Sequence, residues 1–143
     1  MVEKGQNCMN YILDTNICIY MLKHKSFNIL KNAKKKSRTE IFISSITEAE
    51  LWDGVWSSKR IQENGQQLKT FLQCFPKLSF DSSSAITYGQ IKSAQKKTGK
   101  NIGPNDLLIA AQALEIEATL VTANEKELQQ IEGLKIENWL DAT

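Results

Sequence analysis

Short apolar, β-prone runs alternate with helix-length stretches along this chain, and this alternation constrains its fold more than any other feature. The runs lie at 11–13, 41–43, 78–80, 119–121 and 134–136. Several of the stretches between them carry apolar residues at three- and four-residue steps, which is the helical period. Strands separated by helices form a parallel sheet that is covered on both faces. We therefore expect a three-layer α/β/α domain around a central parallel sheet of about five strands.

Two of the predicted helices have informative apolar patterns. Ile46, Ala49, Trp52 and Trp56 recur at three- and four-residue steps, so we expect them to form the buried stripe of one helix. Residues 105–115 are apolar nearly all round, which predicts a central, buried helix. Further helices are expected at 16–23, 26–36, 61–74, 85–99 and 124–131.

Composition indicates an ordinary globular protein. The 143 residues fit one domain, and 41% of them are hydrophobic and 24% charged. No apolar run approaches the ~18–20 residues that cross a bilayer. Cys8, Cys18 and Cys74 form no metal-binding or disulfide pattern, and residues 1–7 lack the features of a signal peptide. We expect a cytoplasmic protein that has no membrane segment.

Four turns rich in carboxylate or amide side chains lie at or near strand-to-helix junctions. They occupy residues 14–16, 45–50, 103–106 and 122–127. In a parallel sheet such turns share the carboxyl edge, where ligands bind. Two carboxylates ~4 Å apart repel each other by roughly 4 kcal/mol at an effective dielectric constant of ~20. Mg²⁺ or Mn²⁺ would relieve this repulsion, so the pattern predicts a divalent cation at this edge.

Each of these residues also has a structural explanation as a helix cap. Asp14 or Asn16 can accept the first amide hydrogens of the following helix. Ser45 or Thr47 can open a capping box with the glutamate three residues later. Asp106 suits the first turn of a helix, where the helix dipole favours an acid. Only the occurrence of acids at several junctions of one sheet favours a shared site.

The chain offers little other catalytic chemistry. His24 is the only histidine, and no nucleophile elbow, dinucleotide-binding loop or phosphate-binding loop is present. Sites rich in acids but without histidine or cysteine usually perform phosphoryl transfer with Mg²⁺. The densest basic run indicates either a solvated helix end or contact with nucleic-acid phosphates, and it consists of Lys31, Lys34, Lys35, Lys36 and Arg38.

Four segments, taken in order, resemble PIN-domain ribonucleases, and most of all the VapC toxins of type II toxin–antitoxin pairs. They are Leu-Asp-Thr-Asn at 13–16, Ile-Ser-Ser-Ile-Thr-Glu-Ala-Glu-Leu at 43–51, Ile-Gly-Pro-Asn-Asp at 102–106 and Val-Thr-Ala-Asn at 121–124. The closing Gly-Leu-Lys-Ile-Glu-Asn-Trp at 133–139 is similar as well. The resemblance spans about residues 9–140. It implies a single PIN-like nuclease domain over 9–143, preceded by an extension at 1–8.

The resemblance also implies the residues of a metal site. Asp14, Glu50 and Asp106 correspond to the invariant acids of the family, and Asn124 corresponds to its variable fourth position. These four residues are the expected catalytic set, and together with Glu127 they are the expected ligands of one or two Mg²⁺ or Mn²⁺ ions. The cation would activate water for attack on a phosphodiester. The residues expected to support the ligands are Thr15, Asn16 and Thr122.

The family implies particular substrates and partners. The Asp-Thr-Asn-Ile-Cys-Ile sequence at 14–19 resembles members that cut initiator tRNA. We therefore expect an RNA substrate, with weak RNA contacts from the basic run at Lys34, Lys35, Lys36 and Arg38. A homodimer and a small antitoxin that covers the acid-lined groove are also implied. Trp52 and Trp56 are candidates for an interface, although most of their stripe is expected to be core.

Two other functions remain open from the sequence. A catalytically inactive PIN-like module could act by binding alone, although the intact acids at positions 14, 50 and 106 argue against it. An α/β phosphoacceptor domain would also hold Mg²⁺ at a sheet edge. It would need a lysine and a serine or threonine at later strand ends, and only Thr122 meets that requirement in part.

Overall fold

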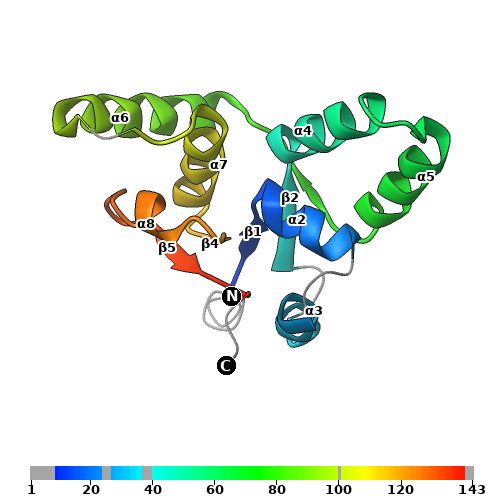
Figure 1. The fold of residues 1–143 in the computed structure, drawn as a ribbon. Helices are drawn as coiled ribbons and strands as arrows, with labels where there is room; N and C mark the ends of the chain where they lie inside the picture. Colours follow the sequence, from blue (N-terminus) through cyan, green and yellow to red (C-terminus); the bar gives the residue numbers. More distant parts are fainter. Residues whose placement is uncertain (1–8, 24–26, 37–39, 100, 141–143) are drawn as a thin grey trace.

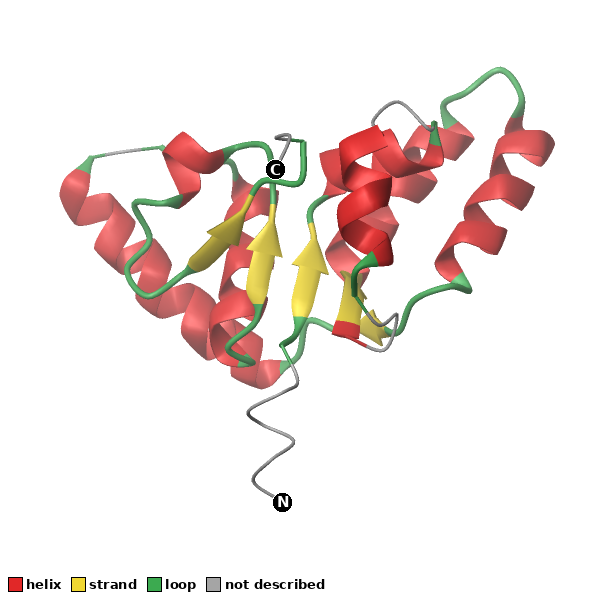
Figure 2. Ribbon diagram, turned by 90° about the horizontal axis from the view of Figure 1, so that it is seen from below, coloured by secondary structure: helices red, strands yellow, loops and turns green. Residues whose placement is uncertain are grey.

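A parallel sheet of five strands forms the centre of the molecule (Figures 1 and 2). The computed structural model describes residues 9–23, 27–36, 40–99 and 101–140. The strand order is β3-β2-β1-β4-β5, and every pair is parallel. This confirms the expected parallel sheet. The strands are β1 (Tyr11–Leu13), β2 (Ile41–Ser44), β3 (Lys77–Leu78), β4 (Thr119–Val121) and β5 (Lys135–Glu137).

Helices cover both faces of the sheet, as expected for a three-layer α/β/α domain (Figure 1). Tyr11 and Leu13 belong to one buried cluster, whereas the intervening Ile12 belongs to the other, so β1 is buried on both sides. None of the described helices is long and apolar enough to cross a membrane. The helices are α2 (Thr15–Leu22), α3 (Phe27–Lys34), α4 (Ser45–Trp56), α5 (Ile61–Leu72), α6 (Ser82–Thr98), α7 (Pro104–Glu115) and α8 (Glu125–Leu128).

The chain reverses its direction of travel across the sheet between β1 and β4. It first moves outward from β1 through β2 to β3, and then crosses over to β4 on the other side of β1. Leu13 is in register with Ile43 and with Val121, so β1 and β4 end level with each other and β2 continues one residue farther. Ligands bind at such a switch point, outside the carboxyl ends of the strands. Asp14 and Thr122 are the first residues beyond these ends.

The buried face of α4 differs from the expected stripe. Thr47, Leu51 and Val55 face the core, whereas Ala49 is exposed and Trp56 is 67% exposed. Both sets of residues recur at helical spacing, so periodicity alone could not decide between them. The expectation holds in part, since Ile46 and Trp52 are partly buried against the core. It was wrong for Ala49 and Trp56, because the sheet and α5, which the sequence pattern does not place, determine which side of α4 is covered.

The cap of α4 also differs from the expected one, whereas the cap of α2 is one of the two expected residues. Ser44 caps α4, since its Oγ accepts the Ile46 amide at 3.0 Å. Ser45 is the first residue of the helix, and its Oγ instead accepts the backbone amide of Phe80 at 3.2 Å, so neither Ser45 nor Thr47 caps α4. Asp14, and not Asn16, caps α2. A capping box identified from spacing can shift by one residue when two adjacent serines compete for the cap.

Candidate active site

The end of β1 places Asp14 at the centre of the carboxyl edge. Its side chain is 4% exposed, and its Oδ1 accepts the amide of Ile17 at 2.9 Å. The Thr122 side chain, at the end of the neighbouring β4, also hydrogen-bonds the Asp14 carboxylate. Thr122 Oγ1 in turn accepts the Asn124 amide at 2.9 Å. Asp14 is therefore held rigidly between the first turn of α2 and the turn that follows β4.

Glu50 approaches the same edge from α4. Its Oε1 accepts the hydroxyl of Thr15, and its Oε2 accepts the amide Nδ2 of Asn105 at 2.7 Å. Thr15 lies at the start of α2 and Asn105 at the start of α7. One carboxylate therefore bridges the first turns of two helices that leave different parts of the fold.

Asp106 occupies the first turn of α7 and is joined to the turn after β4. The Asn124 Nδ2 lies 3.1 Å from Asp106 Oδ2 and 3.1 Å from Glu127 Oε1. Asn124 precedes α8 but makes no side-chain cap there, because its amide points to the two carboxylates. The structure thus brings together the predicted residues Asp106, Asn124 and Glu127.

The carboxylates at this edge influence the ionisation of one another. Burial raises the pKa of Asp14 from 3.8 to about 6, against hydrogen bonds from Thr122 and Ile17, and the charges of Asp106 and Glu50 raise it further. Burial also raises the pKa of Asp106, with smaller contributions from Glu127 and Glu50, while the Asn124 hydrogen bond lowers it. Three acids from distant parts of the sequence therefore share one electrostatic environment.

The donor atoms suit a divalent cation, although they do not close around one. Within the described residues, no three Asp, Glu, His or Cys side chains are arranged to hold a single ion. Both oxygens of Glu50 are engaged by Thr15 and Asn105, which accounts for part of this arrangement. Mg²⁺ commonly keeps several waters and takes only one or two carboxylates from the protein. The buried carboxylate of Asp14 beside partly buried Asp106 fits that type of site.

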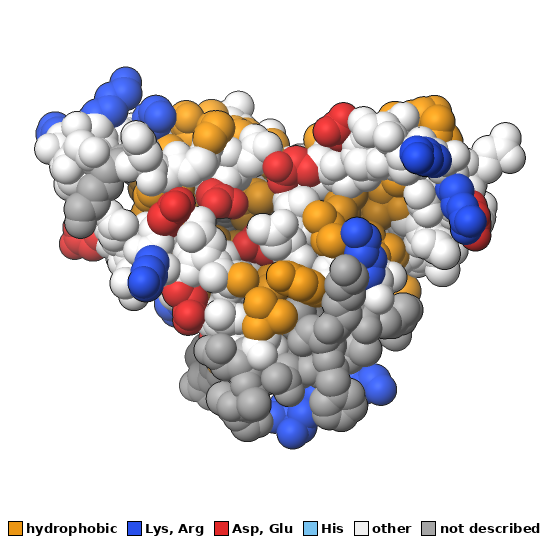
Figure 3. Space-filling model, viewed as in Figure 1, with side chains coloured by type: hydrophobic (Ala, Val, Ile, Leu, Met, Phe, Trp, Pro, Cys, Tyr) orange, Lys and Arg blue, Asp and Glu red, His pale blue; other side chains and the backbone are white. Residues whose placement is uncertain are grey.

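The acidic side chains gather in a notch between two arms of the molecule (Figure 3). One arm is formed by α6, α7 and α8, and the other by α4 and α5 (Figure 1). The predicted basic run lies elsewhere, on and after α3. Lys36 Nζ is 4.7 Å from the centre of the Tyr11 ring, at the beginning of β1, and Arg38 lies outside the described residues. The described lysines of this run do not lie in the acidic notch.

Two residues at the site and one beneath it were not predicted from the sequence. Asn105 was part of the Gly-Pro-Asn-Asp segment, but only its neighbour was assigned a role. Thr47 is fully buried within hydrogen-bond reach of Thr15, at 3.4 Å between the hydroxyl oxygens. Gln112 is a fully buried amide within the apolar middle of α7, which is a signal that the sequence did contain. Asn16, a predicted supporting residue, is exposed.

Comparison with known proteins identifies the family. The PIN domain matches residues 11–134 of the chain. Ribonuclease VapC2 of Rickettsia felis is 39% identical over 132 residues, which cover 92% of this chain and 98% of the relative. The chain belongs to the VapC family of PIN-domain ribonucleases. This membership excludes the phosphoacceptor alternative.

Other VapC proteins are similar in sequence and in structure. The tRNA(fMet)-specific endonuclease VapC of Salmonella typhimurium is 33% identical over 92% of this chain and 98% of its own length. The crystal structure of DNA-bound VapBC from Salmonella typhimurium contains a chain that superposes with a TM-score of 0.87, covering 92% of this chain and 98% of that one. The chain from the Rickettsia felis VapBC2 complex with a promoter DNA fragment superposes with a TM-score of 0.85 and covers 92% and 99%. The VapC fold is thus shared over nearly the whole length.

Proposed function

We propose that this protein is a metal-dependent endoribonuclease and the toxin of a toxin–antitoxin pair. The observation that carries the proposal is the convergence of Asp14, Glu50 and Asp106 at the switch point of a VapC-family sheet. The relatives named ribonuclease and endonuclease support the activity. A cytoplasmic location is part of the proposal, because the proposed RNA substrate and antitoxin would be met there.

The proposed cation is Mg²⁺ or Mn²⁺, because its ligands are carboxylate and amide oxygens. When bound, it would supply Lewis-acid activation of water and phosphate. Thr122 and the Ile17 amide hold the Asp14 carboxylate in one orientation, so little reorganisation is needed during the reaction. Thr15 and Asn105 hold Glu50 on the opposite wall of the notch. The residues proposed to take part in binding the ion are Asp14, Glu50, Asp106, Asn124 and Glu127.

The proposed substrate is tRNA, with initiator tRNA as the specific target. Support comes from the Salmonella typhimurium and Shigella flexneri relatives, which are named tRNA(fMet)-specific endonucleases and are 33% and 30% identical to this chain. The test is incubation of the purified protein with a tRNA mixture in Mg²⁺ or Mn²⁺, with and without EDTA. We expect discrete cleavage that EDTA stops and that Asp106→Asn abolishes. Cleavage that persists both in EDTA and in the Asp106→Asn variant would contradict the metal mechanism.

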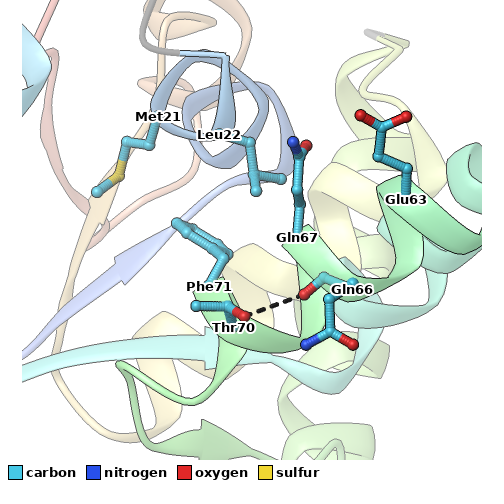
Figure 4. A pocket seen from close by; sticks show the side chains of 7 residues that line it. All are labelled: Met21, Leu22, Glu63, Gln66, Gln67, Thr70 and Phe71. Carbon is cyan, nitrogen blue, oxygen red and sulfur yellow. Dashed lines mark hydrogen bonds between the residues drawn. The ribbon is translucent and has the colours of Figure 1, made fainter.

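The antitoxin is proposed to bind along α5, where two grooves expose apolar side chains. The groove between α4 and α5 measures about 490 Å³ and is lined by Trp52, Trp56 and Ile61, among others. The groove between α2 and α5 measures about 650 Å³ and presents Met21, Leu22 and Phe71 (Figure 4). An apolar antitoxin segment suits these surfaces, because large aromatic side chains are favoured at interface centres. An antitoxin arginine that reaches the acids would pair with them as a fork and compete with the cation.

Trp56 provides a sharp test of this groove. Truncation of an anchoring aromatic residue weakens binding by about 2 kcal/mol or more, roughly 30-fold. We expect Trp56→Ala to lose that much affinity for the antitoxin, whereas Ile86→Ala, which removes an equally exposed side chain from α6, changes little. The other candidate occupant of this groove is a second copy of the chain in the proposed homodimer. Sedimentation of the protein without antitoxin measures its oligomeric state and so tests this alternative. Dissociation of the dimer in Trp56→Ala, with antitoxin affinity unchanged, would assign the groove to that copy.

A further inference from the structure

Gln112 is a fully buried amide in the middle of the central helix α7. Its exposed fraction is zero, and its neighbours Ala111 and Ala113 are fully buried as well. Burial of an amide costs free energy unless its polar atoms are hydrogen-bonded. A side chain that filled space alone would be expected to be apolar here. The hydrogen bonds of Gln112 therefore indicate why this position holds an amide.

The amide of Gln112 belongs to a series of hydrogen bonds in which the donor and the acceptor of each bond are fixed. Its Nε2 donates to the Leu78 carbonyl at 3.1 Å, and a carbonyl can only accept. Its Oε1 must therefore face Ser44, whose hydroxyl donates to it at 2.5 Å. The same Ser44 oxygen accepts the Ile46 amide at 3.0 Å and so caps α4. Each polar atom of Gln112 thus has a partner of the right kind.

This series of hydrogen bonds joins the two helices that form opposite walls of the notch. Gln112 lies on α7, which bears Asp106 in its first turn, whereas Ser44 caps the start of α4, which bears Glu50. At the outer level the same helices are connected by the 2.7 Å bond from Asn105 to Glu50. That outer bond involves an exposed amide, so it restrains the helices less than a buried bond does. The inner link also holds the two-residue strand β3 through Leu78.

We propose that Gln112 is a positioning residue of the active site, and that its buried amide fixes α7 against the start of α4 and so sets the separation of the Asp106 and Glu50 carboxylates. The proposal rests on the metal-dependent function proposed above. Partners that orient metal ligands through hydrogen bonds typically change metal affinity by about 10- to 100-fold when they are removed. Gln112 acts one step farther away, through the placement of two helices, so the lower end of that range is expected.

The test compares metal binding by folded variants without RNA. Gln112→Met keeps the length of the side chain but removes both hydrogen bonds, and Ser44→Ala removes the other end of the same link. Ser84→Ala is the matched control, because Ser84 on α6 is also a buried serine at a helix start. Its hydroxyl bonds Asp81 at 3.1 Å and Glu115 on α7 at 3.4 Å, so it contacts α7 without joining that helix to α4. We expect the Mn²⁺ dissociation constant from calorimetry to rise about tenfold in Gln112→Met and Ser44→Ala, but not in Ser84→Ala. The double variant should be no worse than Gln112→Met, since one link is lost in each case.

A second measurement keeps this proposal separate from the proposed function. Hydrogen exchange of the Ile46 amide reports the link at the start of α4 whether or not metal binds. We expect faster exchange in Gln112→Met and none of this effect in Ser84→Ala. Wild-type protein that binds no Mn²⁺ would contradict the metal function, whereas the exchange result would still report on the link. Variants that fold, with unchanged Mn²⁺ affinity and unchanged Ile46 exchange, would overturn the role of Gln112. Should Gln112→Met not fold, Ser44→Ala with unchanged Mn²⁺ affinity would overturn it alone.

Discussion

At the scale of single residues, Asp14 serves two opposing purposes. Its Oδ1 caps α2 through the Ile17 amide, which stabilises the fold. Its charge, however, is buried near two other carboxylates, and this destabilises the ionised form. Such conflict between stability and charge is typical of residues retained for function. The cap alone would be served equally well by asparagine.

Replacement of Asp14 by asparagine should stabilise the metal-free protein at neutral pH while abolishing RNA cleavage. The folded-state pKa of about 6 lies above the unfolded value of 3.8. The contribution of Asp14 to the free energy of unfolding is therefore fully present below the unfolded-state pKa and is lost as pH rises through about 6. The shift corresponds to about 3 kcal/mol at pH 7.5. Urea unfolding in EDTA between pH 4 and 7.5 measures the difference.

The control for this prediction is Asp53→Asn, which changes an exposed carboxylate on α4. It should leave both cleavage and the pH dependence of stability unchanged. Equal pH profiles of stability for wild type and Asp14→Asn would show that ionisation of Asp14 does not destabilise the folded state. Retained cleavage by Asp14→Asn would remove this residue from the catalytic set.

At the scale of elements, the junctions between strands and helices carry the site, and the helices behind them set its dimensions. The first turns of α2 and α7 supply Thr15 and Asp106 to one edge, and the second turn of α4 supplies Glu50. Contacts between α4 and α5 keep the second arm in place, and Gly65 lies at this contact. The two arms therefore depend on helix packing that lies far from the acids.

Two glycines at helix positions should respond in opposite directions to alanine. A Cβ on Gly65 would lie 3.6 Å from Val55 Cγ1 and 3.7 Å from Trp52 Cζ3, which is ordinary contact distance. Gly65→Ala should therefore stabilise the protein by about 0.5–1 kcal/mol, because glycine is a poor helix former. Gly99 ends α6 with φ at +71°, so Gly99→Ala should destabilise by about 1 kcal/mol. Denaturant midpoints of the two variants decide the signs, and a destabilised Gly65→Ala would show that the α4–α5 contact is closed to a methyl group.

At the scale of the whole molecule, charge is separated between the notch and the arms. Acidic side chains gather between the arms, whereas lysine and arginine side chains occupy the outer parts of both arms and also the bottom of the molecule in this view (Figure 3). Lys96 and Lys97 are exposed in the last turn of α6. Lys36, in contrast, packs on the Tyr11 ring, and its pKa is raised by Tyr11, Glu137 and Glu40. The distribution favours RNA contact by the arms over contact by the run near α3.

The two basic regions can be compared directly in an Asp14→Asn background, where RNA should remain intact. Lys96→Gln with Lys97→Gln should weaken tRNA binding and lower the slope of log affinity against log salt by roughly 2, because two phosphate contacts are lost. Lys34→Gln with Lys35→Gln removes the same charge from the other region and should have less effect. The opposite order would favour the basic run that the sequence pattern suggested.

The sequence by itself determined the order of strands and helices and the edge at which the acids meet. Periodicity is local, and parallel strands always end at a shared edge, so residues 14, 50 and 106 could be placed together without coordinates. The tertiary structure alone decided which side of α4 is buried, which serine caps it, and how far Asp14 is removed from water. It also decided the Asn105–Glu50 and Gln112–Ser44 bonds. These features depend on how elements distant in sequence pack together, and local spacing does not encode that packing.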